Sequence, residues 1–205
     1  MTIIIPANSA ADTAFSVDNS CRFNGADSAY LTKTLGTPTD NLKWTFSGWV
    51  KRCQTSGDGP IMSIGGDTSS FTRIDFNGSG QIEFDNKVGA SYSGRRKTSA
   101  LHRDHAAWYH IVAVFDSANA TGDDRMILYV NGSRITAFAT DTDPSSDEAS
   151  GNTSSQTIRF GVLQTATYFS GYMAEMVFID GQALTPTSFG EFDEDSPTIW
   201  KPIDI

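Results

Sequence analysis

Residues 108–116 read Trp-Tyr-His-Ile-Val-Ala-Val-Phe-Asp, a stretch dominated by aromatic and β-branched side chains. Residues 42–50, Leu-Lys-Trp-Thr-Phe-Ser-Gly-Trp-Val, have the same character. Side chains of these kinds are enriched in β-strands, because they pack well on a pleated surface. Neither stretch has the 3.6-residue periodicity of a helix. We therefore expect both to be strands.

Two hairpins extend this pattern. Residues 126–130, Met-Ile-Leu-Tyr-Val, precede Asn131-Gly132, a strong signal for a two-residue turn, and residues 133–138 would form the returning strand. Residues 73–76 and 81–84 flank Asn-Gly-Ser-Gly, and their apolar side chains alternate. The alternation predicts one buried face and one wet face.

The rest of the chain adds strands and little helix. Residues 157–160 and 171–179 have strand character, and residues 118–124 and 141–155 are expected as loops. One short helix is predicted near residues 185–192, with Thr185 as its N-cap and a proline in its first turn. Many strands with one short helix predict an all-β fold, two antiparallel sheets packed face to face as a β-sandwich.

Composition narrows the classes of partner. The 205 residues carry a formal net charge of −9, so the surface repels phosphate backbones and anionic headgroups, and no nucleic acid is expected as a partner. The run Arg95-Arg96-Lys97 is expected in a solvated loop or edge strand. No run of 18 apolar residues occurs, so no membrane insertion is expected. Cys21 and Cys53 are expected as free thiols, although their pairing stays open.

Five motifs in order resemble laminin-G-like domains, the jelly rolls of the concanavalin A-like lectin/glucanase type. They lie at residues 20–31, 44–51, 108–116, 128–132 and 171–185. The resemblance implies a jelly-roll domain over residues 20–192. Residues 1–19 would then be an N-terminal arm or added strand, and residues 193–205 a tail that leads to further sequence beyond Ile205.

The C-terminal stretch has a narrower resemblance. Residues 178–186, 189–196 and 199–202 are similar to virion proteins of marine tailed bacteriophages. This resemblance implies a non-catalytic structural or adhesion module of a virion, in a tail fibre or appendage, that binds a host surface glycan or other virion proteins. A homo-oligomer is expected, with a trimer favoured. The alternatives are a capsid head-decoration protein and a polysaccharide-degrading glycoside hydrolase.

The hydrolase is tested first, because glucanases share this sandwich. Retaining hydrolysis requires two carboxyl groups ~5 Å apart beside the scissile bond. Glu175 and Asp180 have opposite parity on a regular strand, so they are expected on opposite faces. The carboxylates between Asp75 and Glu83 are expected on the wet faces of a hairpin. We therefore expect no catalytic residues, and His110 is expected as a hydrogen-bonded, partly buried imidazole.

Calcium is the cofactor that the resemblance implies, since many laminin-G domains bind it at the rim of the sandwich. Calcium requires six to eight oxygen ligands. No fixed-spacing cage is present, and Ala174 stands where the closing motif usually carries Asp. We therefore expect no bound metal. The candidates are loop aspartates, Asp67 and Asp124 first and then Asp123, Asp141, Asp143 and Asp147.

A sugar site would require an exposed aromatic ring beside polar groups. Tyr92 and Tyr168 lie among Gly, Ser and Thr and are the two candidates for ligand binding. Four other aromatic residues are expected in the core: Tyr30, Trp49, Trp108 and Tyr172.

Overall fold

The computed structural model describes residues 15–164 and 166–205, which form two antiparallel sheets packed as a sandwich. The predicted N-terminal arm, with its Ile3-Ile4-Ile5 segment, lies outside the described residues up to Ala14. Residues 15–20 are described and form no strand. The all-β prediction is confirmed. Within the described residues, no helix is long and apolar enough to cross a membrane.

One sheet has six strands in the order β1-β15-β3-β8-β9-β10. Its bounds are β1 Cys21–Phe23, β15 Gly171–Asp180, β3 Lys43–Arg52, β8 Tyr109–Asp116, β9 Met126–Val130 and β10 Ser133–Arg134. Strands β3 and β8, formed by the two aromatic-rich stretches, pair in the centre of this sheet, with Trp49 opposite His110.

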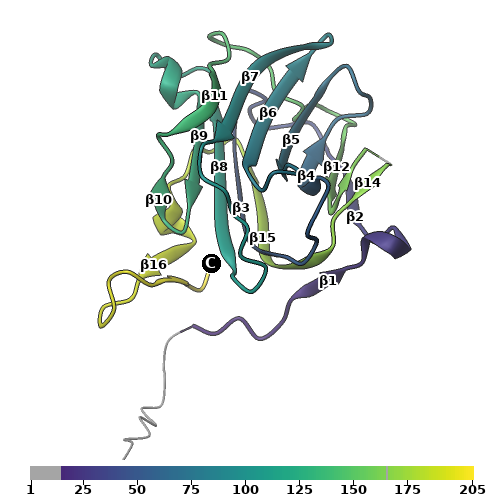
Figure 1. Ribbon diagram of the computed structural model, residues 1–205. Coiled ribbons are helices and arrows are strands. Elements are labelled where there is room, and N and C mark those ends of the chain that lie inside the picture. Colours follow the sequence, from purple (N-terminus) through teal and green to yellow (C-terminus); the bar gives the residue numbers. More distant parts are fainter. Residues whose placement is uncertain (1–14, 165) are drawn as a thin grey trace, which may run out of the picture.

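The other sheet has seven strands in the order β11-β7-β6-β5-β4-β12-β2. Its bounds are β11 Phe138–Thr142, β7 Ser91–Thr98, β6 Ile82–Val88, β5 Phe71–Phe76, β4 Gly59–Ile64, β12 Thr157–Phe160 and β2 Leu31–Thr34. Figure 1 shows β7, β6, β5 and β4 side by side in one layer, while β8, β3 and β15 belong to the other. The small pairs β13 Val162–Leu163 with β14 Thr167–Tyr168, and β16 Gly190–Phe192 with β17 Trp200–Pro202, lie outside these layers.

The core lies between the layers and is rich in aromatic rings. Trp44 is fully buried, 5.6 Å from Phe84 and 5.9 Å from Phe115 between ring centroids. Its indole N–H donates to Ser150 Oγ at 2.9 Å, so this buried polar group is satisfied. Such aromatic contacts join the two sheets and fix which face of each strand is buried.

Two predicted elements differ from the structure. The turn at Asn131-Gly132 is confirmed, with positive φ at both residues, but the returning strand ends at Arg134 instead of Phe138. Phe138 instead begins β11, which pairs with β7 in the other sheet. The chain crosses the edge of the sandwich here, and an apolar pattern alone cannot tell which sheet the next strand joins.

The helix predicted near 185–192 is a single 3-10 turn, Pro186–Ser188, after the N-cap position Thr185. Gly190–Phe192 forms β16 instead and pairs with β17. The chain leaves the helical path because Phe189 is buried against Val112 and Val114, and the Gly190 backbone packs on the Trp200 ring. Tertiary packing here overrides the local helix signal.

Candidate functional site

An ionic cluster covers the outer face of the seven-stranded sheet, the face turned away from the core. Ile74, Phe76, Ile82 and Phe84 point into the core, so their neighbours along the strands point outward. Six charged residues from β5, β6 and β7 form the cluster: Arg73, Asp75, Glu83, Asp85, Arg95 and Lys97.

Arg73 lies at the centre of the ionic cluster. Its guanidinium nitrogens are 3.4 Å from Asp75, 3.1 Å from Glu83 and 2.9 Å from Asp85. The carboxylates are almost fully covered, with 1 % of Asp75, 4 % of Glu83 and none of Asp85 exposed. Cations that contact three buried carboxylates offset the cost of removing those charges from water.

The remaining cations complete the pairing. Arg95 lies 3.2 Å from Glu83 and 3.1 Å from Asp85, and Lys97 lies 2.9 Å from Glu83. Arg96 points to the opposite side of β7 and pairs with Asp141 and Asp143. The prediction that the basic run lies in a solvated loop or edge strand is therefore wrong. The run lies in β7, an interior strand with acidic partners on both faces.

The carboxylates of the ionic cluster differ in their pKa values. Burial raises the pKa of Asp75 to about 8, against the opposing attraction of Arg73. Burial also raises the pKa of Asp85, although Arg73 and Arg95 oppose it. For Glu83, burial is outweighed by hydrogen bonds from Lys97 and Asn77, so its pKa is lowered. These carboxylates contact cations of their own sheet, and Asp75 is closed to solvent.

An aromatic platform lies at one end of the ionic cluster and consists of Phe71, Lys87, Tyr92 and Arg95. Tyr92 is 40 % exposed as a residue, and its ring meets that of Phe71 edge-on, with 6.4 Å between centroids. The Arg95 guanidinium lies 4.3 Å from the centre of the Tyr92 ring, and the Lys87 ammonium lies 5.4 Å from it. Cations over an aromatic face hold the ring in place. Tyr92, one of the two predicted residues, is thus a fixed ring that stays accessible.

A rim cavity of about 250 Å³ adjoins the aromatic platform. Phe71 and Lys87 belong to its wall as well, and Lys87 Nζ donates to the Thr68 carbonyl at 2.9 Å. The loops at this end supply small and polar wall residues, among them Gly65, Asp67, Ser70 and Gly151. The platform and the rim cavity together place an apolar ring beside polar groups, as ligand sites require.

Tyr168, the other predicted residue, belongs to a different surface. It lies on β14, which contacts β4, and its ring is 6.3 Å from that of Tyr30. Strands β6, β5 and β4 separate it from β7 and Tyr92 in the sheet order. The structure therefore does not bring the two predicted tyrosines together.

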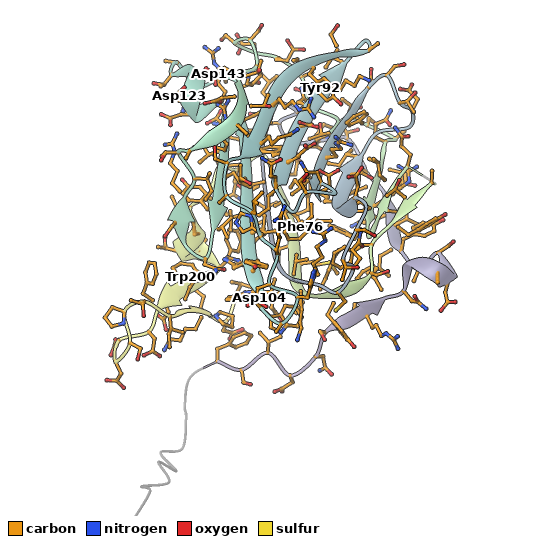
Figure 2. All side chains as sticks on the ribbon, in the orientation of Figure 1. Phe76, Tyr92, Asp104, Asp123, Asp143 and Trp200 are labelled. Atoms are coloured by element: carbon orange, nitrogen blue, oxygen red, sulfur yellow. The ribbon has the colours of Figure 1, made fainter. Side chains whose placement is uncertain are left out.

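The aspartates predicted as metal candidates lie in different places: Asp67 lines the rim cavity, whereas Asp123 and Asp141 line another cavity. Asp67 accepts from the backbone N–H groups of Ser69 and Ser70, which lowers its pKa. Asp124 pairs with Arg134 at 2.6 Å. Figure 2 shows Asp123 and Asp143 on one side of the molecule and Tyr92 on another. Among residues 15–164 and 166–205, no three His, Cys, Asp or Glu side chains are grouped as a metal site.

The outer face of the six-stranded sheet carries Trp49, Trp108 and Tyr172, three of the four aromatic residues that were predicted for the core. Trp108 is 36 % exposed, while Trp49 is partly covered by residues 17–20 and Pro202. The fourth residue, Tyr30, directly precedes β2 of the other sheet and is 45 % exposed. Tyr172 is also only partly buried. The prediction that Trp49 lies in the core is wrong because of strand alternation. Its neighbours Gly48 and Val50 face the core, so Trp49 faces outward.

His110 is buried on this same outer face, with 1 % of the residue exposed. Its ring nitrogens contact Ser47 Oγ and Trp200 Nε1, each at 2.9 Å, and burial lowers its pKa to about 4. The imidazole is therefore a neutral, hydrogen-bonded structural group. Cys21 and Cys53 are exposed free thiols.

Sequence reasoning missed Phe71, Lys87 and the ionic cluster as a unit. The outward positions of Arg73, Asp75, Glu83 and Asp85 could be read from the alternation in the predicted hairpin. The third strand, β7, supplies Arg95 and Lys97, and its pairing with β6 was not visible in the sequence.

Comparisons with known proteins agree with this architecture. The mouse laminin α1 LG4-5 structure matches with a TM-score of 0.57 and 14 % identity, over 91 % of this chain and 48 % of that one. The SAP-like pentraxin of Limulus polyphemus, a heptamer, matches with a TM-score of 0.56 and 20 % identity, over 78 % of this chain and 72 % of that one.

The sialidase module CBM40 of Ruminococcus gnavus, solved with α2,3-sialyllactose, matches with a TM-score of 0.52 and 11 % identity, over 78 % of this chain and 95 % of that one. No curated protein sequence is significantly similar to the chain. A family model described as the concanavalin A-like lectin/glucanases superfamily matches residues 23–188. The chain therefore belongs to the concanavalin A-like lectin/glucanases superfamily, in its Laminin_G_3 family.

Proposed function

We propose that this domain is a non-catalytic carbohydrate-binding module whose site is the aromatic platform with the rim cavity. The observation that carries the proposal is the exposed Tyr92 side chain, held by Phe71, Lys87 and Arg95 beside a cavity whose wall includes polar residues. The apolar face of a sugar ring packs on such an aromatic ring, and polar groups at the edge bind its hydroxyls. A ring that is already fixed loses little entropy on binding.

The alternative function is polysaccharide hydrolysis. The pairing of the carboxylates in the ionic cluster argues against this activity. A glycosidase requires one carboxyl group as acid and another as nucleophile or base, both facing the substrate. Here Arg73 contacts all three outward carboxylates of β5 and β6, and Asp75 is closed to solvent. Charges paired in this way support the sheet, and a substrate would have to displace Arg73 to reach them.

The likeness to the Ruminococcus gnavus module adds support, because that protein is solved with a sialylated sugar. We propose further that the domain belongs to an appendage of a bacteriophage virion. Its partners would be other virion proteins or a host glycan, and it would form a homo-oligomer, with a trimer favoured. This proposal rests on the C-terminal sequence resemblance. Immunogold microscopy of particles that encode the chain should label an appendage, and labelling of the capsid would favour the head-decoration alternative.

Replacing Tyr92 with alanine should weaken binding to the best ligand of a glycan array by about fivefold, because an aromatic stacking contact contributes ~1 kcal/mol. Binding is measured by calorimetry on the purified domain. Tyr30→Ala is the matched control, since Tyr30 is comparably exposed but lies on another surface. Equal affinities of wild type and Tyr92→Ala would contradict the assignment of the site.

A further inference from the structure

A second cavity lies on the outer face of the six-stranded sheet, where residues 17–20 approach Pro202. Its volume is about 270 Å³, and its wall includes Trp49, Trp108, Ala174 and Pro202. Trp49 pairs with Ala174 on one side and with His110 on the other, and Trp108 is two residues before His110. Because alternate residues share a face, Trp49 and Trp108 project on the same side of the sheet.

Trp49, in the wall of this cavity, belongs to a stack of three rings. The Trp49 ring lies 4.9 Å from His110 at an angle of 27°, and His110 lies 5.9 Å from Trp200 at 22°. Trp200 arrives from β17, and Figure 2 shows it near the C-terminal strands, away from Tyr92. The stack fixes Trp49 from behind. Because burial lowers the pKa of His110 to about 4, the imidazole adds no positive charge at neutral pH.

Ala174 provides the space beside Trp49. Its small side chain stands directly opposite Trp49 in the register, at the start of the bulge in β15. A larger residue at this position would fill the cavity next to the indole. The residues before β1 form the opposite wall and contribute Asp18 and Asn19.

The wall of the cavity carries negative charge and no positive charge among the described residues. Asp18 is the one charged residue in its wall, and neither Lys nor Arg contributes to it among the described residues. The faces of indole rings are electron-rich and attract cations, most strongly where water is displaced. The net charge of −9 for the chain favours cations at long range as well.

We infer that this cavity binds an alkylated ammonium group, with Trp49 and Trp108 as aromatic walls and Asp18 as the counter-charge. Its volume falls just below the usual range for drug-sized ligands, ~300–1,000 Å³, and suits a headgroup of the size of trimethylammonium. The inference does not depend on the proposed sugar site, which lies on the outer face of the other sheet.

The test is a titration of the purified domain with choline chloride. Binding is monitored by tryptophan fluorescence and by the indole N–H signals in NMR spectra. The matched probe is 3,3-dimethylbutan-1-ol, which has the shape of choline without its charge. Choline should bind at least about fivefold more tightly than the alcohol, as expected for cation–π contacts. Equal affinities would overturn the inference, because they would show an apolar cavity without selectivity for cations.

Three variants locate the site. Trp108→Leu should weaken choline binding by about fivefold, and Asp18→Asn should weaken it by about threefold, as partly exposed charges allow. Ala174→Leu should abolish it by filling the cavity. Trp108 and Asp18 are exposed, so these two variants should fold, and circular dichroism checks this. Tyr92→Ala should leave choline binding unchanged. Choline binding that survives Trp108→Leu and Asp18→Asn at full strength would overturn the assignment.

Discussion

Replacing Arg73 with methionine should lower the free energy of unfolding by about 3 kcal/mol or more, the range expected when one partner of a buried ion pair is removed. Arg73 contacts Asp75, Glu83 and Asp85, and all three carboxylates are nearly inaccessible to water. Methionine preserves the apolar stem but leaves these buried carboxyl groups without their central cation. Chemical denaturation at neutral pH measures the change.

Lys43→Met is the matched control for this prediction. Lys43 pairs with Asp116 at 3.5 Å, and its side chain is 32 % exposed. An ion pair of this kind should contribute less than about 1 kcal/mol. If Arg73→Met cost no more than the control, the ionic cluster would not be a structural unit, and its carboxylates would again be candidates for catalysis.

Replacing Asp75 with asparagine should stabilise the domain increasingly as the pH rises. The pKa of Asp75 is raised from its ordinary value of 3.8 to about 8 by burial, so the folded state holds a proton that the unfolded state releases. The contribution of Asp75 is therefore fully favourable below its unfolded pKa and is lost as the pH rises through about 8. Asparagine mimics the protonated acid at every pH.

Denaturation of both proteins at about pH 5 and about pH 9 tests this prediction through proton linkage. The advantage of Asp75→Asn over wild type should be larger at the higher pH. Asp67→Asn is the control, because hydrogen bonds from Ser69 and Ser70 lower the pKa of Asp67, so its effect should be the same at both. A variant that is less stable than wild type at the higher pH would show that the Asp75 carboxylate is stabilising in its charged form.

The sequence predicts the sandwich because its strands carry their signal locally. Residues 42–50 and 108–116 are apolar enough to be central strands, and Asn131-Gly132 has the positive φ values that its turn requires. Which sheet the strand after this hairpin joins cannot be predicted from its local sequence. Phe138 joins β7 in the other sheet because of contacts formed only after folding.

The same limit applies to the candidate site. Tyr92 could be recognised by its polar surroundings, but Phe71 and Lys87 join it only through the pairing of β5, β6 and β7. Arg95-Arg96-Lys97 resembled a solvated run because its acidic partners are distant in sequence. Strand alternation sends Arg95 and Lys97 to one face and Arg96 to the other, and each face supplies its own carboxylates.

The most direct measurement is an NMR titration of the isotopically labelled domain with the glycan that it selects from an array. Binding at the aromatic platform and the rim cavity predicts shifts at Phe71, Lys87, Tyr92 and residues 65–70, with the glycan recovered intact. Shifts confined to another surface, or new reducing ends in the recovered glycan, would contradict a non-catalytic binding module on this face.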